Sequence, residues 1–323
     1  MFRNIRHFLS IKNSSENFLF SKRTENLHIA QKIIFFYYFC PIIFMVWQYK
    51  VWIRMIHHST ILPLWPITWI NFVDAQIGII IILLISIIGF CIAAFFSQHS
   101  WARIIACIAA FQLAALINSY GKVSHYWHGW VLTSFLLIFL PNDWKESSQT
   151  MQREKREKIY LIFSACQIIL LLGYSMAGVW KFIGAIYQIS MGEVNLFSPE
   201  AFATHIADRL LQTNVKSIAG DFMIEHHFIG SVFLISGVYI QAFSLCAAFR
   251  PALQKIWGLL LISFHIGTAL TLTIGFWEQC ALLILFFLFT PFDYKNISIK
   301  ERILQFPLLY GFQQRLKKKI SSI

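Results

Sequence analysis

Long apolar runs alternate with short polar segments along most of the chain. A helix needs about 20 mostly apolar residues to cross a bilayer. The run at 77–96 is free of charged residues and is flanked by Asp74 and Gln98. The runs at 124–140 and 277–292 are shorter, which favours positions inside a helix bundle over positions that face lipid. The pattern predicts eight transmembrane helices, at about 33–49, 77–96, 102–120, 124–140, 159–182, 228–249, 256–274 and 277–292.

The composition supports a membrane protein. Of the 323 residues, 57% are hydrophobic and only 13% are charged, whereas about a quarter of the residues in a soluble domain are charged. A soluble fold with this composition would expose large apolar patches, which soluble monomers rarely do. We therefore predict an all-α integral membrane protein, a polytopic bundle of about eight transmembrane helices. Nucleic-acid binders, disordered chains and secreted disulfide scaffolds are excluded.

The net charge of +12 is distributed unevenly between the predicted loops. Counted over alternate sides of an eight-helix bundle, 21 Lys or Arg residues lie on the side of the termini and five on the opposite side. This count includes Arg103 as a loop residue. Cytoplasmic loops are enriched in Lys and Arg, so both termini are predicted to be cytoplasmic. The predicted organisation is a basic cytoplasmic segment 1–32, a membrane domain 33–292 and a basic cytoplasmic tail 293–323, which includes a basic amphipathic stretch.

The segment 184–227 is the longest polar stretch between two predicted helices, and it carries more acidic than basic residues. Ser198, followed by Pro and Glu, is typical of a helix start. Phe202, Ile206 and Leu210 then fall on one helical face. We interpret this part as an amphipathic helix on the outer membrane surface.

Metal binding is not predicted. The six cysteines lie in apolar stretches without zinc-ligand spacing, which is typical of packed thiols. The pairs His57-His58 and His226-His227 are adjacent residues, and neighbouring side chains on a helix diverge.

Ionisable residues inside a membrane are costly and are therefore functional candidates. Four stand out: His128, Lys181, His265 and Glu278. Each also has an ordinary explanation: His128 in an interfacial aromatic belt, Lys181 as a lysine extending to the headgroups, His265 as a packing residue, and Glu278 as a headgroup-exposed carboxylate. If Lys181 instead lies in a dry pocket, desolvation favours the neutral amine, which can act as a base.

Three short blocks carry a family resemblance. They are Tyr126-Trp127-His128-Gly129, Ala177-Gly178-Val179-Trp180-Lys181, and Phe264-His265 followed by Thr273-Ile274-Gly275-Phe276. In this order they resemble segments of the integral-membrane domain of vitamin K-dependent gamma-carboxylases, known in bacteria as the horizontally transferred transmembrane (HTTM) domain. The sequence departs from the family pattern at Trp180, where the family has a second lysine, and at Trp127, where it has an asparagine.

The resemblance implies a function and a site. In the family, the lysine of the second block is the proposed base that deprotonates a reduced quinone, which then reacts with oxygen and drives carboxylation. Carried over, Lys181 is the base and His128 is linked to the carboxylation step. His265, Trp180, Gly178 and Thr268 would bind the quinol, of the menaquinol or vitamin K hydroquinone type. Lys181, His128 and His265 are expected to line one cavity in the outer half of the bundle.

The resemblance leaves two functions open. One is a quinol-using, carboxylase-like or oxygenase-like enzyme of the bacterial inner membrane, acting on a peptide or small molecule at the outer side. The other is a non-enzymatic HTTM protein that takes part in the maturation or export of a secreted peptide. A transporter is disfavoured, because the sequence shows neither inverted repeats nor broken helices.

Overall fold

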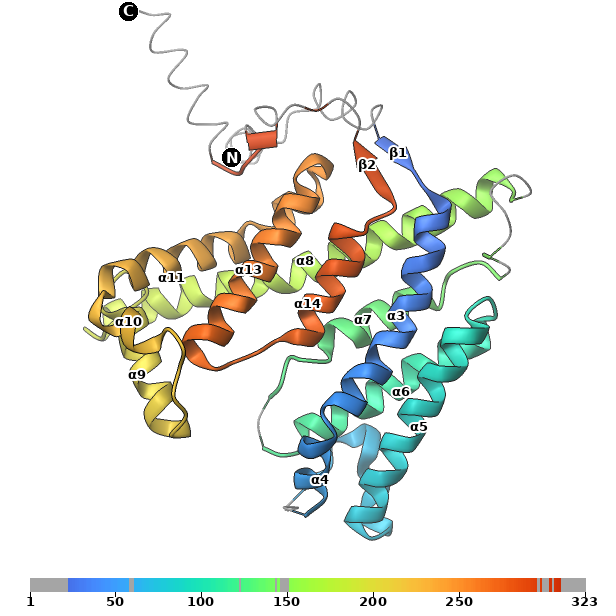
Figure 1. Cartoon of the computed structure of the whole chain (residues 1–323), viewed down its shortest axis with the longest axis horizontal. Helices are drawn as coiled ribbons and strands as arrows, with labels where there is room; N and C mark the ends of the chain where they lie inside the picture. Colours follow the sequence, from blue (N-terminus) through green and yellow to red (C-terminus); the bar gives the residue numbers. More distant parts are fainter. Residues whose placement is uncertain are drawn as a thin grey trace, which may run out of the picture. The chain divides into compact units, whose positions relative to one another are not determined.

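The computed structural model describes residues 23–57, 61–121, 123–142, 144–145, 151–294, 297, 302–303 and 305–308. The described chain is mostly α-helical, with a single two-stranded sheet in that part. Figure 1 shows these helices and strands, and the contacts between them form two compact units. Unit 2 comprises Asn26–Leu170 and Trp277–Pro291, and unit 1 comprises the described residues of Met1–Glu25, Leu171–Phe276 and Phe292–Ile323.

Unit 2 is a bundle around the hairpin of α5 and α6, which pack along their length. Asp74 caps α5 by accepting hydrogen bonds from the backbone N–H groups of Gln76 and Ile77. The Tyr37 hydroxyl joins α3 to α7, at 2.8 Å from Thr133 Oγ1 and 2.7 Å from Ser134 Oγ. The elements of unit 2 are α3 (Leu27–Trp47), α4 (Tyr49–His57), the 3-10 helix η1 (Trp65–Phe72), α5 (Ala75–Phe96), α6 (Ser100–Asn118), α7 (His128–Leu137), α14 (Trp277–Leu283) and the π-helix η3 (Ile284–Leu288).

Helix α8 (Arg153–Ser190) has 38 residues, of which those up to Leu170 belong to unit 2 and those from Leu171 to unit 1. At 1.5 Å per residue it is about 57 Å long, almost twice the bilayer core. The predicted span 159–182 is therefore the middle of a longer helix.

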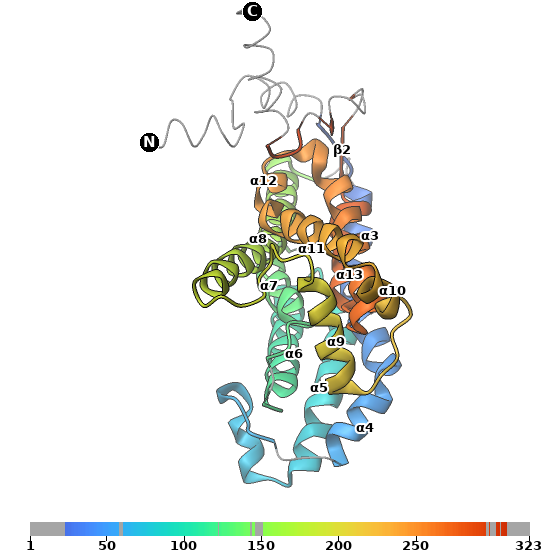
Figure 2. The same cartoon turned by 90° about the vertical axis from the view of Figure 1, so that its left-hand side faces the viewer.

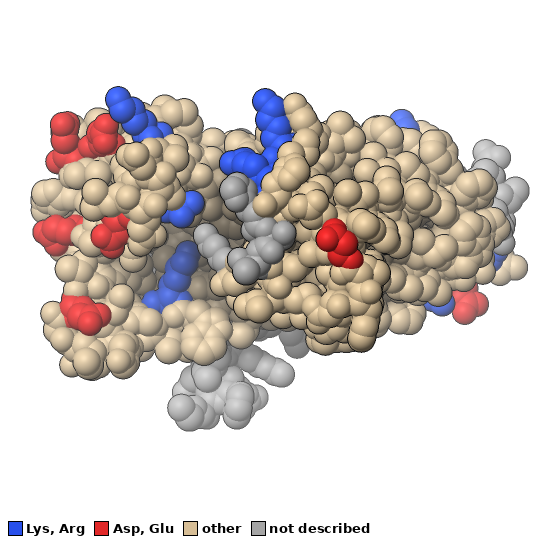
Figure 3. Space-filling model, turned by 90° about the horizontal axis from the view of Figure 1, so that it is seen from below, with Lys and Arg blue, Asp and Glu red and all other residues tan. Residues whose placement is uncertain are grey.

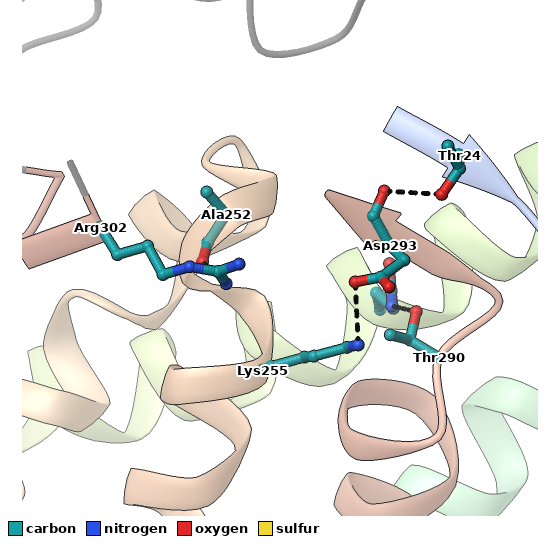
Figure 4. A network of polar contacts seen from close by, with 7 residues as sticks. Thr24, Ala252, Lys255, Thr290, Asp293 and Arg302 are labelled. Atoms are coloured by element: carbon teal, nitrogen blue, oxygen red, sulfur yellow. Dashed lines mark hydrogen bonds and ion pairs between the residues drawn. The ribbon is translucent and has the colours of Figure 1, made fainter. Parts of the chain in front are cut away.

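In unit 1, α11 packs against α13, and α9 packs against α10 and α11 (Figure 2). The second half of α8 is hydrogen-bonded to α11 through Ser175 and to α13 through Tyr174. The strands β1 and β2 pair antiparallel, with Thr24 opposite Asp293. Figure 4 shows Lys255 reaching the Asp293 carboxylate, at 3.2 Å. The remaining elements of unit 1 are β1 (Arg23–Glu25), α9 (Ala201–Thr213), α10 (Gly220–Glu225), α11 (His227–Ala242), α12 (Ser244–Ala248), the 3-10 helix η2 (Pro251–Leu253), α13 (Gln254–Leu272) and β2 (Phe292–Tyr294).

Five helices of the described chain are long and apolar enough to cross a membrane: α3, α5, α6, α8 and α13. The other three predicted spans correspond to shorter apolar helices, at His128–Leu137, His227–Ala242 and Trp277–Leu288. The hydropathy pattern thus placed apolar helices at all eight positions. The count of about eight crossings stays a prediction.

Two expectations need correction. Arg103, counted as a loop residue, is fully buried within α6. Its guanidinium donates to the backbone carbonyls of Ser97, Ile138 and Leu140, where α5 and α7 end. These carbonyls lack intrahelical partners, so the arginine satisfies helix ends and does not mark a solvated loop.

The second correction concerns the outer amphipathic helix. Helix α9 does form at 201–213, and Phe202 and Ile206 do share its apolar face. Both side chains are buried by protein, with Phe202 5.4 Å from the ring of Phe233 on α11. Phe202 and Ile206 therefore pack inside unit 1 and do not face the bilayer, and the position of α9 at the outer membrane surface stays a prediction. The basic stretch of the tail lies largely outside the described residues.

Candidate functional site

Unit 1 contains a pocket of about 570 Å³ between the second half of α8, α9, the middle of α11 and the end of α13. Its volume falls within the range of small-molecule sites. Apolar walls and a few polar groups line it together. The lining residues are Lys181, Gly184, Gln188, Leu196, Phe202, His205, Asp208, Arg209, Gln212, Leu234, Leu272 and Ile274.

Lys181 reaches this pocket from α8, on the same helical face as Gly184 and Gln188. Its Nζ donates a 2.5 Å hydrogen bond to Gln241 Oε1 on α11. The ammonium also lies 5.4 Å from the centre of the Phe264 ring, within the range of a cation–π contact. Among the described residues, no carboxylate lies within 4.0 Å of Nζ. The amine is thus held by a neutral acceptor and an aromatic face.

His265 lies one helical position from Phe264 and is buried in α13. Its Nε2 is 2.6 Å from the Tyr174 hydroxyl of α8. Its Nδ1 is buried without a hydrogen-bond partner among the described residues. A histidine with one committed nitrogen and one unpaired nitrogen is poised to exchange a proton or to bind a further polar group. His265 does not itself line the pocket.

The remaining predicted binding residues of unit 1 occupy three different environments. Gly178 is buried where α8 crosses α11, and a Cβ there would lie 2.3 Å from the backbone nitrogen of Ala242. Close helix approach at this glycine was the expectation, and it is confirmed. Trp180 is 64% exposed, and the Thr268 hydroxyl is buried and bonded to the carbonyl of His265, at 2.9 Å. Of the residues predicted in unit 1, the pocket lining thus includes Lys181 alone, and direct ligand contact by the others stays a prediction.

Helix α9 contributes polar groups that the sequence did not single out. His205, Asp208 and Arg209 line the pocket from about one turn of this helix. The Arg209 Nε is buried without a hydrogen-bond partner in the described chain. Figure 3 shows Lys or Arg side chains recessed in a hollow, beside acidic side chains gathered at one end of the displayed face. With Lys181 and Arg209 against Asp208, the lining carries a net positive charge.

His128 belongs to unit 2, at the start of α7. Its Nδ1 lies 3.1 Å from the Nδ1 of His125. The Gln279 side chain of α14 donates to the backbone carbonyl of His125 at 3.1 Å. The structure therefore places His128 in a histidine pair at the junction of α7 and α14. Its predicted proximity to Lys181 and its catalytic role stay predictions.

Glu278 was expected to be exposed at the headgroups, and this expectation is wrong because its side chain is buried. The residue is only 2% exposed. The Gln48 side chain donates to its carboxylate, and the Trp130 indole donates to its backbone carbonyl at 3.2 Å. A buried carboxyl group at an apolar helix is a functional candidate.

No group of three or more metal-ligating side chains occurs among the described residues.

Sequence reasoning missed Gln241 and Tyr174, the partners of Lys181 and His265. These partners are 60 and 91 residues away along the chain, and neither belongs to a motif. The one available signal was polarity, because Gln241 interrupts an otherwise apolar run at 228–249.

Comparisons of the chain with protein-family models, with curated proteins and with solved structures gave no match. The candidate site therefore rests on its own geometry and on the resemblance of the three sequence blocks.

Proposed function

We propose that this protein is a membrane-embedded, carboxylase-like or oxygenase-like enzyme that binds a reduced quinone in the unit 1 pocket and uses Lys181 as the base. The observation that supports this most is the position of Lys181 Nζ at the wall of a largely apolar pocket, held by Gln241 and without a nearby carboxylate. Apolar walls with a few placed polar groups are typical of sites for small amphipathic ligands.

The residues of the pocket fit such a group. Leu196, Leu234 and Ile274 provide apolar surface for a ring system. Lys181 and His205 provide polar contacts for ring oxygens. When bound, a reduced quinone supplies the electrons for reaction with oxygen.

Lys181 performs the acid–base step at its Nζ. An amine accepts a proton only in its neutral form, and a neutral acceptor such as Gln241 compensates the ammonium charge less than a carboxylate would. The Phe264 ring excludes water from one side of the amine. His205 and Asp208 of α9 line the same pocket and are the groups that would accept the proton from Nζ.

The charge distribution of the loops supports a bacterial inner-membrane location with both termini in the cytoplasm. The pocket then faces the outer side, where a peptide or small-molecule substrate would reach it. The test introduces Gln149→Cys into a cysteine-free background. Labelling of this cysteine by an impermeant thiol reagent in intact cells would contradict the orientation.

The decisive experiment compares Lys181→Arg with the parent in oxygen-dependent consumption of a soluble quinol. Arginine keeps the charge and length but stays protonated, so we expect activity to be lost while folding and quinol binding are retained. Gln241→Glu should have the same effect, because a carboxylate at the Gln241 position stabilises the protonated amine. Lys216→Arg, an exposed lysine of the same unit, is the matched control.

Full activity in Lys181→Arg would refute the base assignment. If the parent protein neither binds nor consumes quinols, the non-enzymatic HTTM alternative, a membrane component in peptide maturation or export, becomes the better account.

A further inference from the structure

Unit 2 contains a second pocket, of about 550 Å³, near the start of α3. It is lined by His28, Gln31, Lys32, Phe35, Phe36, Trp144 and Lys145. No Asp or Glu belongs to this lining, and within the described chain no carboxylate lies within 4.0 Å of either lysine amine. The Lys145 amine donates to the backbone carbonyl of Phe95 at 3.2 Å. Within the described residues, neither ammonium group at this cavity therefore has a carboxylate partner.

The cavity has a fixed wall. Trp144 is fully buried, and its indole donates to the carbonyl of Ser97 at 2.8 Å. Gln31 Nε2 of α3 donates to the Trp144 carbonyl at 3.2 Å, so Trp144 is bonded to α3. The Lys145 amine lies 5.7 Å from the Trp144 ring centre. The short segment at 144–145 is thus anchored, and Lys145 has a defined position.

The N-terminus of α3 adds to the positive potential. The helix begins at Leu27, and the Asn26 side chain accepts a hydrogen bond from Ile29 N. The first N–H groups of a helix attract anions, and the 21-residue α3 is long enough for a full dipole. His28, Gln31 and Lys32 lie in its first two turns.

Phe36, which lines the cavity, is also the first residue of an exposed apolar stripe on α3. Phe36, Phe39, Ile43 and Val46 are exposed at helical spacing along one face. In a membrane-spanning helix such a stripe faces acyl chains. A cationic pocket with aromatic walls at the end of such a stripe matches a molecule with an anionic head and an apolar tail.

We propose that this pocket binds one anionic phospholipid, with its phosphate between Lys32 and Lys145 and an acyl chain along Phe36 and Phe39. Basic pockets beside membrane helices are the expected receptors of such headgroups. The proposal is independent of the quinol site, which lies in the other unit.

The test measures lipid-dependent stability and lipid retention of the full chain in detergent micelles. Phosphatidylglycerol should raise the melting temperature, whereas phosphatidylcholine and inorganic phosphate should not. Native mass spectrometry should detect one retained phosphatidylglycerol. Lys32→Gln with Lys145→Gln should weaken phosphatidylglycerol binding about 30-fold, and each single variant should lose part of that affinity.

Two controls separate this site from general charge effects. Lys158→Gln with Lys255→Gln removes the same number of charges elsewhere and should keep the phosphatidylglycerol effect. Lys32→Arg with Lys145→Arg keeps the charge and should also keep it. The proposal is wrong if phosphatidylcholine or inorganic phosphate raises the melting temperature as much as phosphatidylglycerol does. It is also wrong if the two glutamine double variants lose the same affinity for phosphatidylglycerol.

Discussion

The crossing of α8 and α11 at Gly178 is the contact that positions Lys181, and Gly178→Ala tests it directly. The new Cβ would lie 2.3 Å from Ala242 N and 2.5 Å from its Cα. These are backbone atoms, so no side-chain rotation relieves the overlap. The two helices must separate by about 1 Å to restore ordinary contact distances of about 3.5 Å.

Separation at this point weakens specific bonds. Ser175 Oγ donates to the Ala242 carbonyl at 3.0 Å and accepts from Leu245 N at 2.7 Å. Overpacking of this kind costs about 1–3 kcal/mol, and each lost hydrogen bond about 1 kcal/mol. The higher helix propensity of alanine stabilises the folded state by up to about 1 kcal/mol and offsets part of this cost. With both Ser175 hydrogen bonds lost, the expected net destabilisation is about 2–4 kcal/mol.

The matched control is Gly173→Ala, on the same helix. A Cβ at Gly173 would meet nothing within 4 Å, so this variant should be neutral or up to about 1 kcal/mol more stable. Thermal unfolding in detergent, followed by tryptophan fluorescence, ranks the two variants. Equal melting temperatures for Gly178→Ala and Gly173→Ala would refute the close helix approach and the derived position of Lys181.

Two further changes test other features. Arg103→Met should destabilise the protein by about 2–4 kcal/mol, because three buried carbonyls lose a charged donor. Arg153→Met, at an exposed ion pair, should leave the melting temperature nearly unchanged in the same thermal unfolding assay. Thr273 ends α13 with a left-handed φ of 58°, which is unfavourable for a β-branched residue. Thr273→Gly should therefore raise the free energy of unfolding by about 0.5–1 kcal/mol, and with it the melting temperature. An unchanged or lower melting temperature would contradict backbone strain at Thr273.

The positions of the apolar helices could be predicted from hydropathy, since each predicted run overlaps a helix of the structure. Helix ends were less predictable. Helix α3 begins at Leu27, six residues before the predicted 33–49, because polar His28, Gln31 and Lys32 form its first turns. Hydropathy averages over a window, so it assigns such polar turns to loops.

Polar partners inside the bundle could not be predicted. Arg103 and Glu278 have ordinary surface-type side chains and lie close to the ends of apolar runs, where solvent exposure is the simplest assumption. Their burial depends on carbonyl and amide partners 37 and 230 residues away in sequence. The amphipathic pattern of α9 likewise identified its apolar face but not the protein surface that covers it.

The buried guanidinium of Arg103 has a consequence for the biogenesis of the protein. Its carbonyl partners at Ile138 and Leu140 are synthesised after α6 is complete. Arg103 lies in the first turn of α6, so it costs less than the about 2.5–3.5 kcal/mol of an arginine at a helix centre, but its charge lacks these two partners while α6 is alone in the translocon. We expect α6 to be retained there until α7 emerges, so that the two helices enter the bilayer as a pair.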